Sequence, residues 1–246
     1  MRWAVDGDIL LYAVAYAAKD DPVSYACRSV RAACQDVMYA VNAEAIDIYL
    51  TGSGNYRAEY GDTTYPYKGT RLSEKPAHFT ELKRYMIEEM GAILIEGEEA
   101  DDRMGIDATQ YGHGIATIDK DLNGIAGWHY RWKIRGKDAV VYNVSPEEAD
   151  RFFYLQLLTG DATDNIPGLF KRLGRKVTAP IKEPLQYLHT PEEMYAYVRG
   201  IYSEAYDKVG MCLDDKDEVI DNWILKQARC LWIRREDDEM WEPPHA

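Results

Sequence analysis

Acidic residues gather in four short stretches of this chain. Carboxylates a few ångströms apart repel one another unless their charge is compensated. Divalent cations supply that compensation, and all-oxygen ligand sets favour Mg²⁺ or Mn²⁺ over zinc. Two such ions about 4 Å apart are the usual device for hydrolysing a phosphodiester without a nucleophilic side chain. The stretches hold Asp6 and Asp8; Glu96, Glu98, Glu99, Asp101 and Asp102; Asp119 and Asp121; and Asp161 and Asp164.

Three of these stretches directly follow apolar segments that predict β-strands. Strand and helix signals alternate up to residue 145, which predicts an α/β core with a mostly parallel sheet flanked by helices. Because parallel strands end at one edge of a sheet, the acids are expected to meet there. The predicted strands are 3–5, 46–50, 92–95 and 115–118, the helices 24–41, 79–90 and 99–111, and a hairpin joins 128–134 to 139–142.

Residues 146–246 read as a helical second part, with a helix over 219–233 and a loosely held acidic tail from Glu236. A single aspartate after a strand is most often a helix cap or a turn residue. Asp102 would then cap a helix, Asp164 would form an Asx turn, and Asp8 would be an acid at a helix start. Four groups at one predicted edge favour the metal site.

Composition limits the classes of function. The 246 residues carry 29 basic and 42 acidic side chains, a net charge of −13, which argues against a passive nucleic-acid binder. No apolar run is long enough to span a membrane and the start does not resemble a signal peptide, so no membrane partner is expected. The four cysteines show no metal or redox spacing, which fits a reducing, cytoplasmic compartment.

At the acidic stretches the sequence resembles the 5′-nuclease superfamily of flap endonucleases and 5′→3′ exonucleases. The resemblance is greatest to the stand-alone exonucleases of short-tailed bacteriophages. It covers about two thirds of the chain, with the motifs in the family's order. The matching motifs are Val5-Asp6-Gly7-Asp8, Asn55-Tyr56-Arg57, Tyr67-Lys68-Gly69-Thr70-Arg71, Glu99-Ala100-Asp101-Asp102, Ile118-Asp119-Lys120-Asp121-Leu122 and Gly160-Asp161-Ala162-Thr163-Asp164-Asn165-Ile166-Pro167-Gly168.

The resemblance implies a PIN-like catalytic core over residues 1–145, with an arch-like segment at about 51–85. A duplex-binding part with a helix-hairpin-helix-like segment would cover residues 146–246. It implies Mg²⁺, with Mn²⁺ able to substitute, in two sites of undecided division, and K⁺ at the helix-hairpin-helix-like loop. The implied metal ligands are Asp6, Glu99, Asp101 and Asp119 for one ion and Asp102, Asp121, Asp161 and Asp164 for the other.

The resemblance also implies which side chains contact DNA. Lys68 and Arg71 would grip the scissile phosphate and act in catalysis with Asp6, Asp102 and Asp121. A basic, acid-free stretch from Asn165 to Lys182 would hold duplex phosphates. The implied DNA-binding residues are Arg57, Lys68, Arg71, Lys171, Arg172, Arg175 and Lys176; Tyr56, Tyr60, Tyr65 and Tyr67 would stack on an unpaired 5′ base or pack beneath the arch.

Two departures from the family pattern stand out. An aspartate expected before Arg57 is missing, and Gly52 lies about where it would fall, with Asp8, Glu96 or Glu98 as candidate substitutes. The glycine spacing after Gly168 is about one residue longer than the pattern.

The predicted function is metal-dependent hydrolysis of DNA near 5′ ends, at duplex ends, nicks and flaps, with RNA–DNA hybrids as a further substrate. This activity would serve primer removal, DNA degradation or recombination in a phage or bacterial cytoplasm. No specific protein partner is indicated. The alternatives are a DNA-junction binding protein with weakened catalysis, a PIN-like ribonuclease, and an acidic α/β protein with no nucleic-acid role.

Overall fold

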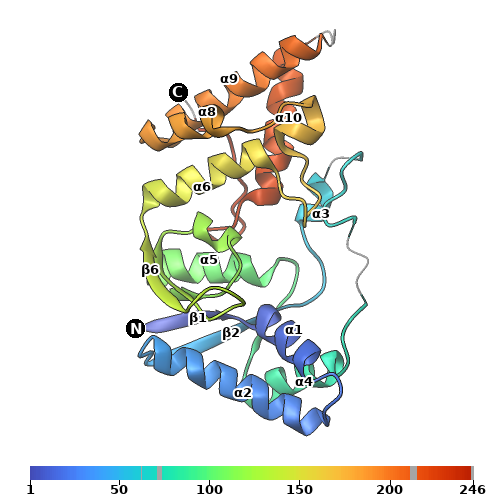
Figure 1. Cartoon of the computed structure of the whole chain (residues 1–246), viewed down its shortest axis with the longest axis vertical. Coiled ribbons are helices and arrows are strands. Elements are labelled where there is room, and N and C mark those ends of the chain that lie inside the picture. Colours follow the sequence, from blue (N-terminus) through green and yellow to red (C-terminus); the bar gives the residue numbers. More distant parts are fainter. Residues whose placement is uncertain (62, 71–73, 211–214, 245–246) are drawn as a thin grey trace. The chain divides into compact units, whose positions relative to one another are not determined.

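The computed structural model describes residues 1–61, 63–70, 74–210 and 215–244. These residues divide into two compact units (Figure 1). The described residues of 1–55, 74–145 and 233–238 form the sheet unit, and those of 56–70, 146–232 and 239–244 form the helical unit. Among the described residues, no helix is both long and apolar enough to cross a membrane.

The sheet unit is built on a six-stranded sheet with strand order β3-β2-β1-β4-β5-β6. All neighbouring strands are parallel except β5 and β6, which form an antiparallel pair. The chain first runs outward from β1 to β3 and then continues on the other side of β1 with β4, so the strand order reverses between β1 and β4. The strands are β1 (Arg2–Asp6), β2 (Ala45–Thr51), β3 (Ile93–Ile95), β4 (Gly114–Ala116), β5 (Gly127–Arg131) and β6 (Val140–Val144).

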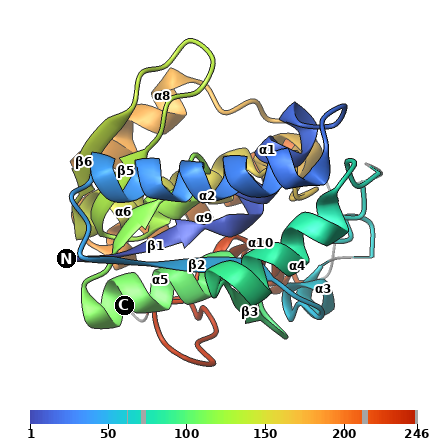
Figure 2. The ribbon, with the colours of Figure 1, turned by 90° about the horizontal axis from the view of Figure 1, so that it is seen from below.

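Helices cover both faces of this sheet because successive strand residues point to opposite sides. Trp3 and Val5 on β1 pack in a core with α1, α2 and α4, whereas Ala4 between them packs in a core with α5. Figure 2 shows α1 and α2 on one side of the strands and α5 on the other. These helices are α1 (Gly7–Ala17), α2 (Val23–Ala40), α4 (Phe79–Met90) and α5 (Ala100–Tyr111); the 3₁₀ helix η1 (Asp121–Gly124) follows β4.

The helical unit has its own buried core, in which α6, α7, α9 and α10 pack together. Tyr202 at its centre is fully buried, and its hydroxyl donates to the Leu157 carbonyl at 2.8 Å. The short helix α3 (Arg57–Tyr60) packs on α10. The remaining elements are α6 (Pro146–Thr159), α7 (Gly168–Leu173), α8 (Ala179–Lys182), η2 (Glu183–Tyr187), α9 (Pro191–Val209) and α10 (Lys216–Leu231).

The predicted fold class is confirmed, and most predicted elements lie within two or three residues of their observed bounds. The expectation of a loosely held tail is wrong. Trp241 is buried in the helical unit against Phe153 and Tyr195, with ring centroids 5.7 and 6.0 Å apart. In the sheet unit, Asp237 accepts from the Arg103 guanidinium at 2.8 Å. The buried Trp241 ring helps to hold this acidic segment, because an aromatic side chain buries a large apolar area.

Candidate metal-binding edge and nucleic-acid surface

Asp6 ends β1 and begins α1, so its carboxylate lies at the carboxyl edge of the sheet. One carboxylate oxygen accepts from the Ile9 backbone N–H at 3.0 Å and thereby caps the helix, and the other accepts from the Thr117 hydroxyl at 2.6 Å. The side chain is buried. Burial, together with the nearby carboxylates of Asp8 and Asp119, raises the pKa of Asp6 to about 7.

Asp101, in the first turn of α5, is half-buried and lies near the same carboxylates. Burial raises the pKa of Asp101 well above its usual value, and repulsion from Asp6, Asp119, Glu99 and Asp102 raises it further. No hydrogen bond joins the Asp101 carboxylate to any residue in the described part of the chain. The raised pKa values favour the protonated forms of Asp6 and Asp101, so a bound cation would help to keep both of them ionised.

Asp119 lies three residues after the end of β4, across the strand-order reversal from Asp6. Its Oδ1 accepts from the Asp121 backbone N–H at 2.9 Å, and its own N–H donates to the Thr117 hydroxyl at 2.9 Å. Thr117 thus bonds both Asp6 and the loop that carries Asp119. Asp121 begins η1, and the Lys120 ammonium lies 3.7 Å from its carboxylate.

Glu99 and Asp102 hold the start of α5 in a reciprocal capping arrangement, which the helix-cap interpretation of Asp102 anticipated. Asp102 is fully buried, and its two oxygens accept from the Glu99 and Arg234 backbone N–H groups at 3.2 and 3.1 Å. Glu99 keeps one oxygen on the Asn55 amide at 2.8 Å. Asp102 therefore fixes the helix start from which Glu99 and Asp101 extend.

The end of β2 shows how the chain accommodates Gly52. A Cβ atom built on Gly52 would lie 2.5 Å from the Glu96 side-chain carboxyl carbon, so Glu96 occupies the space that a larger residue would need. The Glu96 carboxylate accepts from the Ser53 N–H and hydroxyl at 2.7 and 2.6 Å, and these bonds lower its pKa. Among the residues proposed to replace the aspartate missing near Gly52, Glu96 thus occupies this position. Glu98 instead forms an ion pair with Arg234 at 2.8 Å.

Asp8 and Lys83 complete this end of the strand. Asp8 accepts from the Thr51 backbone N–H at 3.0 Å, and burial raises its pKa. The Lys83 ammonium, from α4, donates to the Thr51 carbonyl at 2.6 Å. Its positive charge lowers the pKa of both Asp8 and Glu96, although in Asp8 burial outweighs this effect. Sequence reasoning missed Lys83 because a lysine on a helix before β3 carries no motif.

The donor set at this edge fits a hard divalent cation. Most of the charged side chains here are carboxylates, and burial and neighbouring carboxylates raise the pKa of Asp6 and Asp101. Among the described residues, no group of three or more His, Cys, Asp or Glu side chains is already gathered closely enough to form a complete metal site.

Asp161 and Asp164 belong to the helical unit, in the turn between α6 and α7. Asp161 is buried, and one of its oxygens accepts from the Thr163 and Asp164 N–H groups at 2.7 and 3.2 Å. Backbone bonds between Asp161 and Ile166, at 3.0 and 2.7 Å, close the turn. The Asx turn expected here is therefore present, but at Asp161 rather than at Asp164.

Lys68 lies beside Asp164 within the helical unit. Its backbone N–H donates to the Asp164 carbonyl at 2.9 Å, and its ammonium lies 4.0 Å from the Asp164 carboxylate. Tyr67 donates to the same carboxylate at 3.0 Å. Arg71, the second basic residue of this motif, lies outside the described residues.

Arg57 does not face solvent, contrary to what a DNA contact requires. It is 2% exposed, and its guanidinium donates to the Cys230 and Trp232 carbonyls at 3.1 and 2.6 Å. Its cation also packs over the Tyr56 ring at 4.8 Å. Arg57 thus anchors α3 to the end of α10. A buried arginine cannot be distinguished from an exposed one by its sequence motif.

The basic stretch of the helical unit divides into two kinds of residue. Lys171 and Lys176 are exposed. Arg172 lies between the rings of Tyr65 and Trp223, and Arg175 pairs with Glu204 at 3.1 Å. Lys171 and Lys176 therefore present exposed cations, whereas the arginines are already held by the protein.

Comparisons with known proteins give a match in structure but not in sequence. No protein-family model matches the chain, and the search of curated proteins finds no match either. The chain resembles the bacteriophage T5 D15 protein crystallised with metal ions, at 14% identity and a TM-score of 0.63, over 94% of this chain and 88% of that one.

Two further solved structures, both with DNA, share this fold. One is the bacteriophage T5 D15 flap endonuclease in a pseudo-enzyme–product complex with DNA and metal ions, at 16% identity and a TM-score of 0.53, covering 94% of this chain and 98% of that one. The other is the catalytic core of Rad2 with a DNA substrate, at 14% identity and a TM-score of 0.50, covering 98% and 83%. The chain therefore has the 5′-nuclease fold.

Proposed function

We propose that this protein is a metal-dependent nuclease that hydrolyses DNA phosphodiesters near 5′ ends. One observation carries the proposal. Asp6, Asp101 and Asp119 share one carboxyl edge, and burial and mutual repulsion raise the pKa of Asp6 and Asp101 there. In open α/β sheets this edge, where the strand order reverses, is the usual place for a ligand. The fold shared with DNA-bound nucleases supports the same conclusion.

Four residues of the sheet unit would hold Mg²⁺ or Mn²⁺, and neighbouring groups position each of them. Asp6 is fixed by Ile9 and Thr117, Asp119 by the loop of Asp121, and Glu99 and Asp101 by the start of α5. Bound divalent cations would supply an activated water and neutralise the charge that develops on the phosphate. Asp102, Asp121, Asp161 and Asp164 remain predicted ligands of a second ion.

The helical unit would hold the DNA backbone. Lys171 and Lys176 offer exposed cations to the phosphates, and Lys68 and Arg71 keep their predicted role near the phosphate that is cut. The acidic edge repels DNA until a cation neutralises it, so metal and substrate binding should be coupled. Because backbone contacts carry no sequence information, we expect recognition of ends and junctions. K⁺ at the loop after α7 and activity on RNA–DNA hybrids are further predictions.

A 5′-labelled nicked duplex with a short 5′ flap tests this function directly. Products of about flap length establish a flap endonuclease, and mononucleotides establish an exonuclease; both outcomes support the proposal. An intact substrate in both Mg²⁺ and Mn²⁺ overturns it. Asp101→Asn removes one of the proposed metal ligands. Asp36→Asn, the same change at an exposed position on α2, is its control. Cleavage within a bacterial cell would then serve primer removal, DNA degradation or recombination.

The arrangement at Gly52 supports a second candidate, a DNA-junction binding protein with weakened catalysis. The acid at this position comes from Glu96, which Ser53 already holds with two hydrogen bonds. This candidate predicts tight, metal-independent binding to flaps without turnover. Cleavage of RNA alone would instead favour a PIN-like ribonuclease.

A further inference from the structure

The last segment of the sheet unit, Ile233–Asp238, lies along α5, and we call it the C-terminal strap. Ile233 is buried in the same core as Ala100 of α5. A Cβ atom built on Gly105, also on α5, would lie 2.6 Å from the Arg234 carbonyl oxygen. Atoms that are not bonded do not approach so closely, so only a glycine at this position lets the strap backbone lie directly on the helix.

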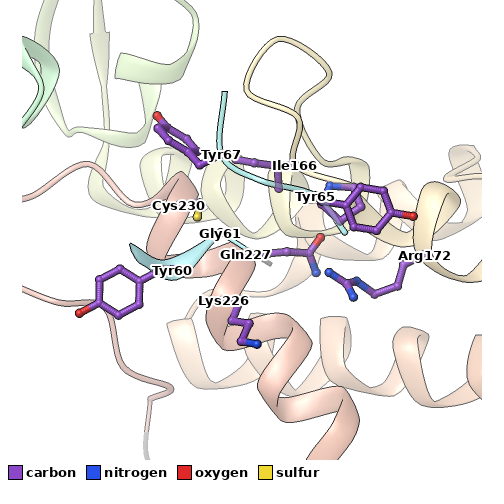
Figure 3. A pocket seen from close by; sticks show the side chains of 10 residues that line it. Tyr60, Gly61, Tyr65, Tyr67, Ile166, Arg172, Lys226, Gln227 and Cys230 are labelled. Carbon is purple, nitrogen blue, oxygen red and sulfur yellow. The ribbon is translucent and has the colours of Figure 1, made fainter. Parts of the chain in front are cut away.

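Both flanks of the strap are held in the helical unit. Before the strap, the Arg57 guanidinium donates to the Cys230 and Trp232 carbonyls at 3.1 and 2.6 Å. Cys230, on α10, and Tyr60, on α3, line the same pocket of the helical unit (Figure 3). After the strap, Trp241 is buried in the core of that unit. The strap is therefore a segment of the sheet unit with a fixed residue on either side of it.

Arg234 holds both ends of the acidic stretch at the start of α5. Its backbone N–H donates to the Asp102 carboxylate at 3.1 Å, and its guanidinium lies 2.8 Å from the Glu98 carboxylate. The side chains of Arg234 and Glu98 are 10% and 16% exposed, so water and salt screen this ion pair weakly. Glu99 and Asp101, two of the proposed metal ligands, lie between these points of contact. Their position therefore depends on the strap.

Arg235, the next residue of the strap, bonds a second element that follows proposed ligands. Its guanidinium donates at 3.1 Å to the carbonyl of Gly124, the last residue of η1. This helix starts at Asp121, whose backbone N–H donates to the Asp119 carboxylate at 2.9 Å. Two neighbouring arginines thus bond the start of α5 and the end of η1, which carry or adjoin the acids from both sides of the metal-binding edge.

We propose that Arg234 and Arg235 are positioning residues of the metal site. They hold α5 and η1 where Glu99, Asp101 and Asp119 bind one divalent cation together. Since cations repel one another, the two guanidinium groups act through the position of the ligands and not by contact with the ion. Groups that hold metal ligands in this way typically change metal affinity by about 10–100-fold when they are removed. The proposal rests on the proposed function, because it concerns the same metal site.

Charge and position predict opposite effects for these arginines. A guanidinium near the acidic edge repels a divalent cation, so by charge alone the loss of Arg234 would tighten cation binding. If Arg234 positions the ligands, its loss weakens binding. The double variant Arg234→Met/Glu98→Gln removes the ion pair without changing the net charge. Gly105→Ala displaces the strap by steric contact and also leaves the charge unchanged. Both variants therefore isolate the effect of position.

Mn²⁺ binding to the whole protein measures this effect without DNA. Electron paramagnetic resonance gives the bound fraction, because the signal of free Mn²⁺ is lost on binding. Arg234→Met, Arg235→Met, Gly105→Ala and the double variant should each weaken binding about tenfold. Arg234→Lys, whose ammonium can still pair with Glu98, should stay within about threefold of the wild type. Arg84→Met, an exposed change on α4, is the matched control and should bind as the wild type does.

The thermal midpoint in chelator shows which variants are folded. Weaker Mn²⁺ binding by folded Arg234→Met and by the double variant, with rescue by Arg234→Lys, supports the proposal. Binding as tight as in the wild type, or tighter, overturns it. If Arg234→Met does not fold, Arg235→Met and Gly105→Ala decide by the same criterion.

Asp101→Asn distinguishes this proposal from the proposed function. If Asp101→Asn loses Mn²⁺ binding and the folded strap variants keep it, only the positioning proposal fails. Equal Mn²⁺ binding by Asp101→Asn and the wild type contradicts the metal site itself, and the positioning proposal fails with it.

Discussion

Replacing Asp6 with asparagine should stabilise the metal-free protein. Asparagine caps helices as well as aspartate does, so the bond to the Ile9 N–H is kept, and its amide N–H₂ can donate to the Thr117 hydroxyl. The carboxylate that it replaces is 3% exposed and lies near Asp8 and Asp119. Asp6→Asn removes a buried negative charge and keeps the shape of the side chain.

The size of the effect follows from the pKa of Asp6, which burial raises from 3.8 to about 7. A pKa raised by about 3 units corresponds to about 4 kcal/mol in the free energy of unfolding. This stability is fully lost at a pH at which Asp6 is ionised in both the folded and the unfolded protein. Since the folded-state pKa is the higher one, this stability is present below about pH 4 and is lost as the pH rises to about 7. The asparagine amide forms weaker hydrogen bonds than the carboxylate, which reduces the expected gain in the free energy of unfolding by about 1 kcal/mol.

Urea unfolding in chelator at pH 4.5, 6 and 8 measures this difference. The free energy of unfolding of Asp6→Asn should exceed that of the wild type by about 3 kcal/mol at pH 8, with little or no gain at pH 4.5. Asp36→Asn, exposed on α2, should follow the wild type at every pH. A difference between Asp6→Asn and the wild type that does not change with pH would refute the repulsion at this edge.

Three further predictions concern other parts of the structure. Arg57→Met should destabilise the protein by about 2–4 kcal/mol in urea unfolding, because two buried carbonyls lose their donor. Gly52→Asp should lower the thermal midpoint by displacing the Glu96 carboxylate, and adding Glu96→Ala should restore it; additive losses would contradict this. Trp241→Ala should lower the free energy of unfolding by about 3–5 kcal/mol. A loss of this size in calorimetry would exclude a loosely held tail.

Periodicity and motif position were enough to predict the sheet and the acids along its edge. Alternation on β1, with Trp3 and Val5 on one face and Ala4 on the other, follows from strand geometry alone. Asp6 and Asp119 lie where acids after parallel strands must lie. These features could be predicted because residues that are close together in the sequence determine them.

Features that depend on distant residues could not be predicted. The burial of Arg57 needs the end of α10, which is far away in sequence. Glu96 lies over Gly52 because β2 and β3 pair side by side, which no motif encodes. Lys83 contacts the Thr51 carbonyl from a helix whose sequence pattern marks only its buried face. Long-range packing determines each of these positions.

The central claim is that the acids at the carboxyl edge of the sheet hold the divalent cations for DNA hydrolysis. Cleavage of the 5′-flap duplex by Asp101→Asn and Asp36→Asn, side by side in Mg²⁺, tests it most directly. The account predicts cleavage by the wild type and Asp36→Asn and none by folded Asp101→Asn. Equal cleavage by Asp101→Asn and the wild type would contradict it.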